Sequence, residues 1–240
     1  ALRNPTVLAK EIATLDFLSG GRVLPAVGLG TEDEREFEAC GSPKRQRGGR
    51  TDEAIEVMKL LWSQDNVTFH GKYYTLNDVT IQPKPVQTDL PPMWIGGRSE
   101  AAIQRTARIG DGWLVSQATP DEVADGVARI KVGALQHGNE IEDDHYGVLF
   151  SYFIADTPEE AAKQAAPYML RRRTDVDYAE FSAFGTPDHV SQLMGRYIDA
   201  GAPKIVVRPA CAPELMMEQL ELLGKEVVPH YHGKKEATVA

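Results

Sequence analysis

The chain has 240 residues, with 26 Lys and Arg against 35 Asp and Glu, so its formal net charge is −9. This acidic balance, and a longest basic run of only 171–173, argue against nucleic acid or an anionic membrane as the main partner. Apolar residues make up 42% of the chain, an ordinary globular composition without an apolar stretch long enough to span a membrane. We therefore expect a soluble protein with a small-molecule partner.

The two cysteines, Cys40 and Cys211, are too few for a disulfide framework and lack the spacing of a metal or redox pair. We interpret them as reduced thiols of a cytoplasmic protein. Packing is favoured over catalysis for both, because no His or Asn partner is near either in the sequence.

Along the chain, the spacing of apolar residues alternates between helical and extended, which is typical of βα units around a parallel sheet. A helix is predicted from Pro5 to the stop at Gly20, followed by a short buried strand over 22–28. Pro25 cannot donate a hydrogen bond, so a bulge or an unpaired edge is expected within this strand.

The segment 31–50 is polar and glycine-rich, and too long for an ordinary connection. It predicts a lid insertion or a disordered segment, mobile without ligand. Its basic cluster (Lys44, Arg45, Arg47 and Arg50) is either an attractor for an anionic ligand or a solvated loop. Thr51 is expected to cap the next helix, and residues 63–91 to form a hairpin and a proline-rich connection.

The second half predicts four more strands, over 93–95, 112–115, 147–155 and 204–208. Helices are expected to begin at Thr119, Thr157 and Thr186, each followed by proline; the first two also have Glu three residues later. A closed (β/α)₈ TIM barrel needs eight strands in about 250 residues. We therefore expect residues 1–240 to be a single barrel domain with about three βα units absent from its start.

Several motifs occur in the order found in one known family. They are Asn4-Pro5, 8–11, 13–22, 26–30, the 36–50 segment, 92–97 and 107–113. Together they resemble the bacterial-luciferase-like family of flavin-dependent oxidoreductases. The resemblance implies a TIM barrel that binds FMN or the deazaflavin coenzyme F-420 at the carboxyl ends of its strands, often as a homodimer. By that alignment the first strand here is the fourth of the barrel. Thr31-Glu32 stands where many relatives carry Trp.

The turn Gly96-Gly97-Arg98-Ser99 follows a strand and opens a helix. Backbone N–H groups, the helix dipole and a hydroxyl converge there, as a phosphate requires. The alternative is a plain tight turn with Ser99 as the helix cap. The family resemblance, in which this turn holds the cofactor phosphate, favours binding.

Four further residues are candidate cofactor contacts. Gly28 and Gly30 end a strand, where glycine permits close approach of a flat ring or a turn with positive φ. Ser116 and Gln117 follow another strand. They are candidates for contacts with the phosphate or the ribityl chain, or for capping of the next helix.

No catalytic or metal-binding residue is predicted. The resemblance places much of the flavin-facing wall, and often a catalytic His, in early strands that this sequence lacks. His230-x-His232 has no supporting carboxylates at metal-ligand spacing, and the acidic run 142–144 is interpreted as a solvated loop.

The resulting hypothesis is a flavin-dependent monooxygenase that uses reduced FMN and oxygen on a small organic substrate. Hydride transfer from reduced coenzyme F-420 is the enzymatic alternative. A non-catalytic flavin-binding protein is the alternative from a different functional class.

Overall fold

The computed structural model describes residues 1–30, 32–169 and 173–231. Thr31 of the expected lid, two residues of the basic run 171–173, and His232 lie outside this part. The chain divides into two compact units. The first comprises Ala1–Trp113 and Gly133–Ile141, and the second Leu114–Val132 and Glu142–Ala240. Strand β5 (Gly112–Ser116) and helix α5 (Pro120–His137) contribute residues to both ranges.

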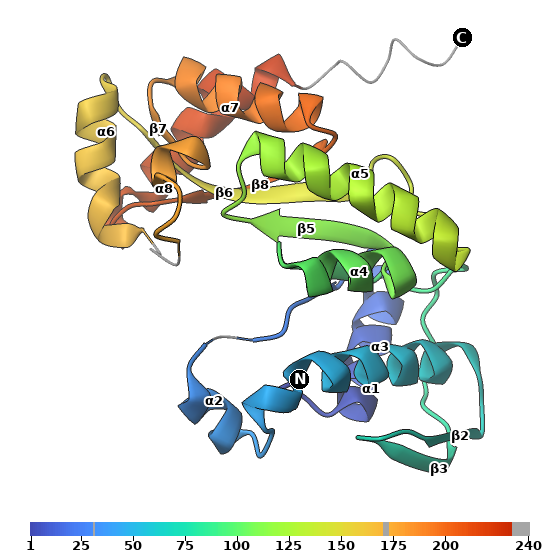
Figure 1. The fold of residues 1–240 in the computed structure, drawn as a ribbon. Coiled ribbons are helices and arrows are strands. Elements are labelled where there is room, and N and C mark those ends of the chain that lie inside the picture. Colours follow the sequence, from blue (N-terminus) through green and yellow to red (C-terminus); the bar gives the residue numbers. More distant parts are fainter. Residues whose placement is uncertain (31, 170–172, 232–240) are drawn as a thin grey trace, which may run out of the picture. The chain divides into compact units, whose positions relative to one another are not determined.

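The first unit contains helices and short strands of a βα protein, with an antiparallel hairpin (Figure 1). Its remaining elements are α1 (Pro5–Ser19), β1 (Ala26–Val27), α2 (Glu34–Ala39), α3 (Arg47–Ser63), β2 (Val67–His70), β3 (Thr75–Val79), β4 (Trp94–Gly96) and α4 (Glu100–Ile109). Strands β1 and β4 pair in parallel, as the alternating pattern predicted. Strands β2 and β3 form the predicted hairpin.

Helix α1 begins and ends as its sequence predicts. The Asn4 side chain accepts hydrogen bonds from the backbone N–H groups of Thr6 and Val7, and Gly20 ends the helix with φ 68°. The helix packs on α3, where the Trp62 indole donates to the carbonyl oxygen of Ala9 at 2.9 Å. These two helices share one apolar core with β4 and the hairpin.

The predicted strand over 22–28 is wrong in its extent, because only Ala26 and Val27 pair with β4. The ladder is preceded by one hydrogen bond, from the Trp94 N–H to the Pro25 carbonyl oxygen at 2.9 Å. Since proline has no N–H to return, regular pairing starts after it. The irregularity expected at Pro25 is thus present.

The segment 31–50, expected to be a lid insertion or a disordered segment, contains helical elements in its described residues. Asp33 caps α2 by accepting from the Arg35 N–H, and Phe37 is 1% exposed. A 3₁₀ turn follows, and α3 begins at Arg47, so Thr51 is a buried residue inside α3 instead of its cap. The buried aromatic ring provides the apolar contact that fixes this polar segment.

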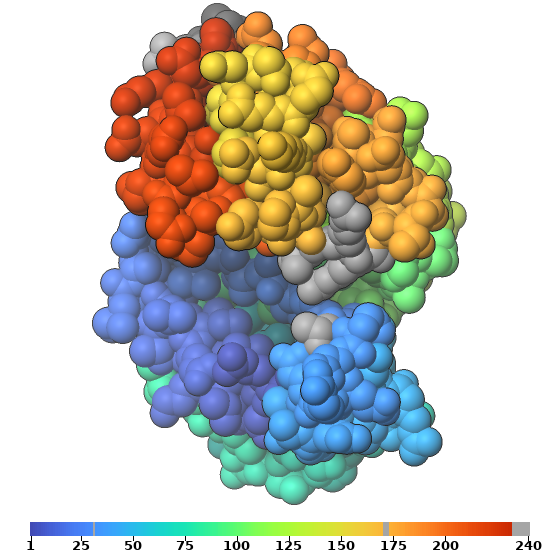
Figure 2. All heavy atoms as spheres, turned by 90° about the vertical axis from the view of Figure 1, so that its left-hand side faces the viewer, coloured from blue at the N-terminus to red at the C-terminus, as the bar shows by residue number. Residues whose placement is uncertain are grey.

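The second unit is built around β6 (Tyr146–Ile154), which pairs in parallel with β7 (Ala183–Gly185) and β8 (Lys204–Pro209). Strand β7 was not predicted, because three residues are too few to show a period. The helices confined to this unit are α6 (Pro158–Ala165), α7 (Pro187–Asp199) and α8 (Met216–Leu222). Side chains of α6 lie at the surface, with residues of the α8 segment beside them (Figure 2).

Two of the three predicted threonine caps are confirmed. The N–H of Glu122 donates to Thr119 Oγ1 and the Glu122 carboxylate accepts from the Thr119 N–H, which completes a capping box. Thr157 caps α6. Thr186 makes no capping hydrogen bond, because its hydroxyl lies 2.9 Å from Nδ1 of His189.

A buried amide side chain closes the carboxyl end of β6. Gln219 of α8 is 3% exposed. Its Oε1 accepts from the Ile154 N–H at 2.7 Å and its Nε2 donates to the Ile154 carbonyl at 3.0 Å. The pairing of β6 with β8 ends at Tyr152 and Pro209, and beyond that point the Gln219 side chain satisfies both backbone groups of Ile154.

In the first unit, a buried carboxylate fastens the proline-rich connection to α1. Asp16 is fully buried and accepts hydrogen bonds from the Val86 N–H, the Gln87 N–H and the Gln87 side chain. Burial disfavours its charge, but these hydrogen bonds outweigh it and hold the pKa of Asp16 below its ordinary value. The ionised form is therefore part of the folded state.

The structure also describes the helices and the two cysteines that the composition singled out. Within the described residues, no helix has the length and apolarity needed to cross a bilayer. Cys40 and Cys211 are unpaired thiols, the first exposed and the second buried. Burial and the nearby Glu214 raise the pKa of the Cys211 thiol, which opposes formation of a nucleophilic thiolate.

We expect Gln219→Leu to lower the free energy of unfolding by about 2 to 4 kcal/mol, because two buried backbone groups of Ile154 lose their partners. Urea unfolding followed by circular dichroism measures this. Gln164→Leu, on the exposed side of α6, is the matched control and should change stability by less than about 0.5 kcal/mol. Equal effects of the two substitutions would contradict the role given to Gln219.

Asp16→Asn should destabilise the protein by about 1 to 3 kcal/mol at neutral pH, because an amide presents N–H groups to backbone donors. Since the folded-state pKa of Asp16 is lowered, its contribution is present above the unfolded-state pKa and is lost as pH falls through the folded-state pKa. The difference between parent and variant should therefore shrink below about pH 4. Urea unfolding at several pH values tests this, with exposed Asp89→Asn as control; a difference independent of pH would refute it.

Candidate functional site

The turn after β4 has the geometry of an anion-binding loop. Gly97 adopts φ +119°, a conformation that favours glycine. Gly97, Arg98 and Ser99 are exposed at the start of the ten-residue helix α4. The Ser99 side chain accepts from the Ala102 N–H at 3.3 Å, so it acts as the helix cap, which was the alternative interpretation. A capping serine can still donate its hydroxyl hydrogen to a ligand.

Residues 110–113 of the same unit build the support of this turn. The Trp113 indole donates to the Gly97 carbonyl oxygen at 2.8 Å, which fixes the peptide plane after Gly97. Asp111 accepts from the Met93 N–H at the start of β4 and pairs with Lys59 of α3. A Cβ on Gly112 would lie 2.5 Å from the Trp94 ring, so this position requires glycine.

The positioning role of Trp113 was missed from the sequence. The sequence did contain an indication of it, because the family-like motif 107–113 ends at Trp113. A Cβ added to Gly97 would lie 3.1 Å from the Ala102 methyl group, so glycine keeps this turn close to the start of α4. The Gly97 backbone is exposed, as a phosphate-binding turn requires.

Gly28 and Gly30 lie in the same unit, after β1, and both are exposed. Gly30 has φ +90°, and a Cβ there would approach Phe37 and Leu2 to 3.1 and 3.2 Å. Both the turn geometry and the packing therefore require glycine at this position. Gly28 has open space around it, and its contact with a flat ring remains a prediction.

Ser116 and Gln117 lie in the second unit, at the carboxyl end of β5. Gln117 has φ +54°, and its carbonyl oxygen accepts from the Arg173 guanidinium at 2.9 Å. The buried Tyr197 hydroxyl donates to the Ala118 carbonyl at 2.7 Å. This loop is thus held on both sides by side chains.

Arg173 is occupied by its own ion pairs. It makes two hydrogen bonds to Glu122, at 2.6 and 2.9 Å, and two to Asp175, at 2.7 and 3.0 Å. Its side chain is 1% exposed. The hydrogen bonds to Asp175 and Glu122 raise the pKa of Arg173 above its ordinary value. We therefore interpret Arg173 as a structural cation.

A cavity of about 220 Å³ lies beside this loop within the second unit. Its polar lining consists of Ser116, Gln117, Ser151, Ser182 and Arg208. The structure thus brings Ser116 and Gln117 together with three polar residues that sequence reasoning missed. Ser151 interrupts the apolar run 147–154 and Arg208 ends the run 204–208, which were their signals. Ser182 had none.

Three members of the basic cluster of the 44–50 segment have structural partners. Lys44 and Arg47 pair with Glu32 at 3.0 and 2.7 Å. The Arg50 guanidinium lies over the rings of Tyr73 and Tyr74. These contacts favour a structural role over the attraction of an anionic ligand.

A groove of about 750 Å³ on the first unit, lined by α3 with Tyr73 and Arg108, contains none of the predicted site residues. Within it, Asp52 pairs with Arg105 and Arg108, and Lys59 pairs with Asp111.

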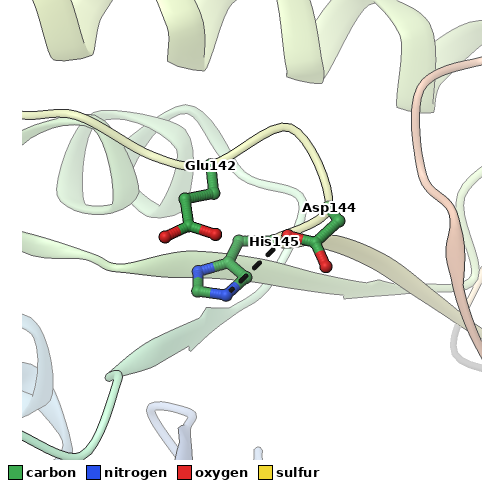
Figure 3. A group of neighbouring side chains, drawn as sticks. All are labelled: Glu142, Asp144 and His145. Carbon is green, nitrogen blue, oxygen red and sulfur yellow. Dashed lines mark ion pairs between the residues drawn. The ribbon is translucent and has the colours of Figure 1, made fainter. Parts of the chain in front are cut away.

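Two carboxylates of the acidic run 142–144 lie beside His145, so that three potential metal ligands are close together (Figure 3). Oxygen and nitrogen atoms of Glu142, Asp144 and His145 lie within 4.8 Å of one another. Asp144 is paired with Lys204 at 3.0 Å, and Asp143 with Lys131 at 2.6 Å. Lysines therefore pair with two carboxylates of the run, of which only Asp144 belongs to the ligand group, as expected of surface ion pairs.

Comparison with known proteins identifies the family. The model of the luciferase-like monooxygenases matches residues 1–189. The chain belongs to this family. It is 34% identical to the FMNH₂-dependent dimethylsulfone monooxygenase of Pseudomonas putida over 161 residues, covering 66% of this chain and 43% of the relative. The chain spans less than half the length of the first curated relatives that it matches.

Two solved structures share the fold. The monooxygenase RslO1 of Streptomyces bottropensis superposes with a TM-score of 0.80 at 21% identity, over 96% of this chain and 75% of that one. An F-420-dependent secondary alcohol dehydrogenase gives 0.77 at 22% identity, over 94% and 74%. The predicted α/β fold of the luciferase-like family is thereby confirmed.

Proposed function

We propose that this protein is a flavin-dependent monooxygenase that uses reduced FMN and oxygen on a small organic substrate. The observation that carries the proposal is the exposed Gly97 turn at the N-terminus of α4, braced by Trp113, in a chain of the luciferase-like family. The similarity to a relative named as FMNH₂-dependent supports FMN as the cofactor.

In this proposal the cofactor phosphate binds at Gly96, Gly97, Arg98 and Ser99. Backbone N–H groups and the helix dipole favour the dianion, and the Arg98 guanidinium adds a positive charge. Gly28 and Gly30 allow a flat ring to approach the backbone. When bound, the flavin supplies the redox chemistry; the chain orients it and limits access of water.

Coenzyme F-420 is the second candidate. The structural likeness to an F-420-dependent alcohol dehydrogenase supports it, as does similarity to the 5,10-methylenetetrahydromethanopterin reductase of Methanopyrus kandleri. A glycine turn at a helix N-terminus binds any phosphate. The same residues would therefore serve either cofactor.

The proposal also includes the compartment, the oligomeric state and the partners of the enzyme. We place it in the cytoplasm as a homodimer acting on a small molecule, without a nucleic-acid or membrane partner. The acidic net charge and the family resemblance support this setting. We also propose that the 31–50 segment acts as a lid through movement of its helical elements.

Titration with FMN, reduced FMN and F-420 distinguishes the cofactors, because each has its own absorbance and fluorescence. We expect reduced FMN to bind most tightly, and an oxygenated product to form when an FMN reductase supplies reduced FMN together with a substrate. Tighter binding of F-420, with oxidation of its reduced form that needs no oxygen, would favour the hydride-transfer alternative. Binding of neither cofactor would refute the proposed function.

Gly97→Val should reduce affinity for the bound cofactor at least tenfold, about 1.4 kcal/mol, because φ +119° and the Ala102 methyl group at 3.1 Å do not accommodate a branched side chain, so the turn must shift. Gly138→Val is the control for backbone strain, since Gly138 also has positive φ but open surroundings. Unfolding midpoints of both variants separate lost binding from lost folding. Unchanged affinity in a folded Gly97→Val protein would show that the phosphate binds elsewhere.

A further inference from the structure

The cavity beside Ser116 and Gln117 has the size of a small ligand. Its volume of about 220 Å³ is below the range of about 300 to 1,000 Å³ that is typical of pockets for drug-sized molecules. The cavity suits a small molecule of a few heavy atoms, or one end of a longer one.

Arg208 gives the cavity a positive charge. Its Nη2 donates to Ser151 Oγ at 3.1 Å and to the Tyr168 carbonyl oxygen at 3.4 Å, both neutral acceptors. Among the residues that the structure describes, no carboxylate pairs with Arg208, in contrast to the doubly paired Arg173. A half-buried guanidinium with neutral partners retains N–H donors that favour an anion.

Two buried hydroxyl groups lie on the same cavity. Ser151 is 8% exposed and Ser182 5% exposed. The Ser182 hydroxyl has no hydrogen-bond partner among the described atoms, which is costly for a buried polar group. A ligand oxygen that accepts this hydrogen would remove that cost, as would a bound water molecule when the ligand is absent.

The remaining wall is apolar. Leu149, Phe150, Met169 and Phe181 line the cavity together with these polar groups. A ligand that satisfies both parts has an oxyanion for Arg208 and Ser182 and a short hydrocarbon body for the apolar wall. Inorganic phosphate or sulfate would leave that wall without a partner.

We propose that this cavity is the subsite for the acid group of the substrate, and that the substrate is a small aliphatic carboxylate or sulfonate. Arg208 pairs with the oxyanion, Ser182 donates to it, and Ser151 orients the guanidinium. The assignment to a substrate rests on the proposed function. The assignment of an oxyanion to the cavity rests on these contacts.

Binding of 1-propanesulfonate and of its uncharged isostere 1-propanesulfonamide, measured by isothermal titration calorimetry, tests the charge requirement. We expect the sulfonate to bind at least tenfold more tightly than the sulfonamide. Arg208→Gln should remove that preference, Arg208→Lys should retain part of it, and Ser182→Ala should weaken sulfonate binding about three- to tenfold. Arg129→Gln removes an exposed guanidinium of the same unit and should change nothing.

Three results would overturn the proposal. They are equal binding of sulfonate and sulfonamide by the parent, no binding of either, or an Arg208→Gln variant that keeps the preference. If Arg208→Gln fails to fold, Arg208→Lys and Ser182→Ala decide the test. If the preference for sulfonate came only from the net charge of the protein, Arg129→Gln would reduce it as much as Arg208→Gln does.

Cofactor titration of the same variants identifies the source of the acid group. We expect Arg208→Gln to bind FMN or F-420 within about twofold of the parent. A loss of cofactor affinity equal to the loss of sulfonate affinity would overturn the substrate assignment, because the cavity would then hold the cofactor phosphate. A parent that binds sulfonate through Arg208 but neither cofactor would refute the proposed function and leave the oxyanion subsite standing.

Discussion

Buried backbone groups at strand ends and in loops must be hydrogen-bonded, and this constraint governs both units. Where a neighbouring strand does not supply the partner, a side chain has to do so. Asp111 serves the start of β4, and Gln219 the end of β6. Asp16 does the same for the connection at Val86 and Gln87. Each is a polar side chain whose removal leaves backbone groups unpaired.

Side-chain hydrogen bonds to backbone groups also fix the loops of the candidate site. Loops at the carboxyl ends of parallel strands carry function in βα proteins, but a loop binds well only when its conformation is fixed beforehand. Trp113 fixes the peptide after Gly97, and Arg173 and Tyr197 fix the loop around Gln117. The side chains that stabilise these loops are not the ones expected to touch a ligand.

Sequence patterns predicted what depends on neighbours along the chain. The helix start at Pro5, the caps at Thr119 and Thr157 and the helices that follow them were found this way, because capping is local. Thr186 has the same local pattern, yet His189 engages its hydroxyl, a competition that spacing does not reveal. The helical content of 31–50 was missed because one buried ring, Phe37, outweighs a polar and glycine-rich composition. Likewise, Ser182 could not be predicted as a site residue, because only the folded chain places it with Arg208 on one cavity.

Because the chain is acidic, an anionic ligand depends on contacts with individual cations such as Arg208. A net charge of −9 repels anions at long range, and salt screens that field over about 10 Å at 0.1 M ionic strength. An anionic ligand is therefore held by contacts at close range. Arg173 donates to the carbonyl oxygen of Gln117, and Arg208 lines the cavity beside that loop. Arg173 is neutralised by Glu122 and Asp175, whereas Arg208 contacts only neutral oxygens among the described residues. Two arginines of identical chemistry thus divide into a structural and a binding cation, and their carboxylate partners make the difference.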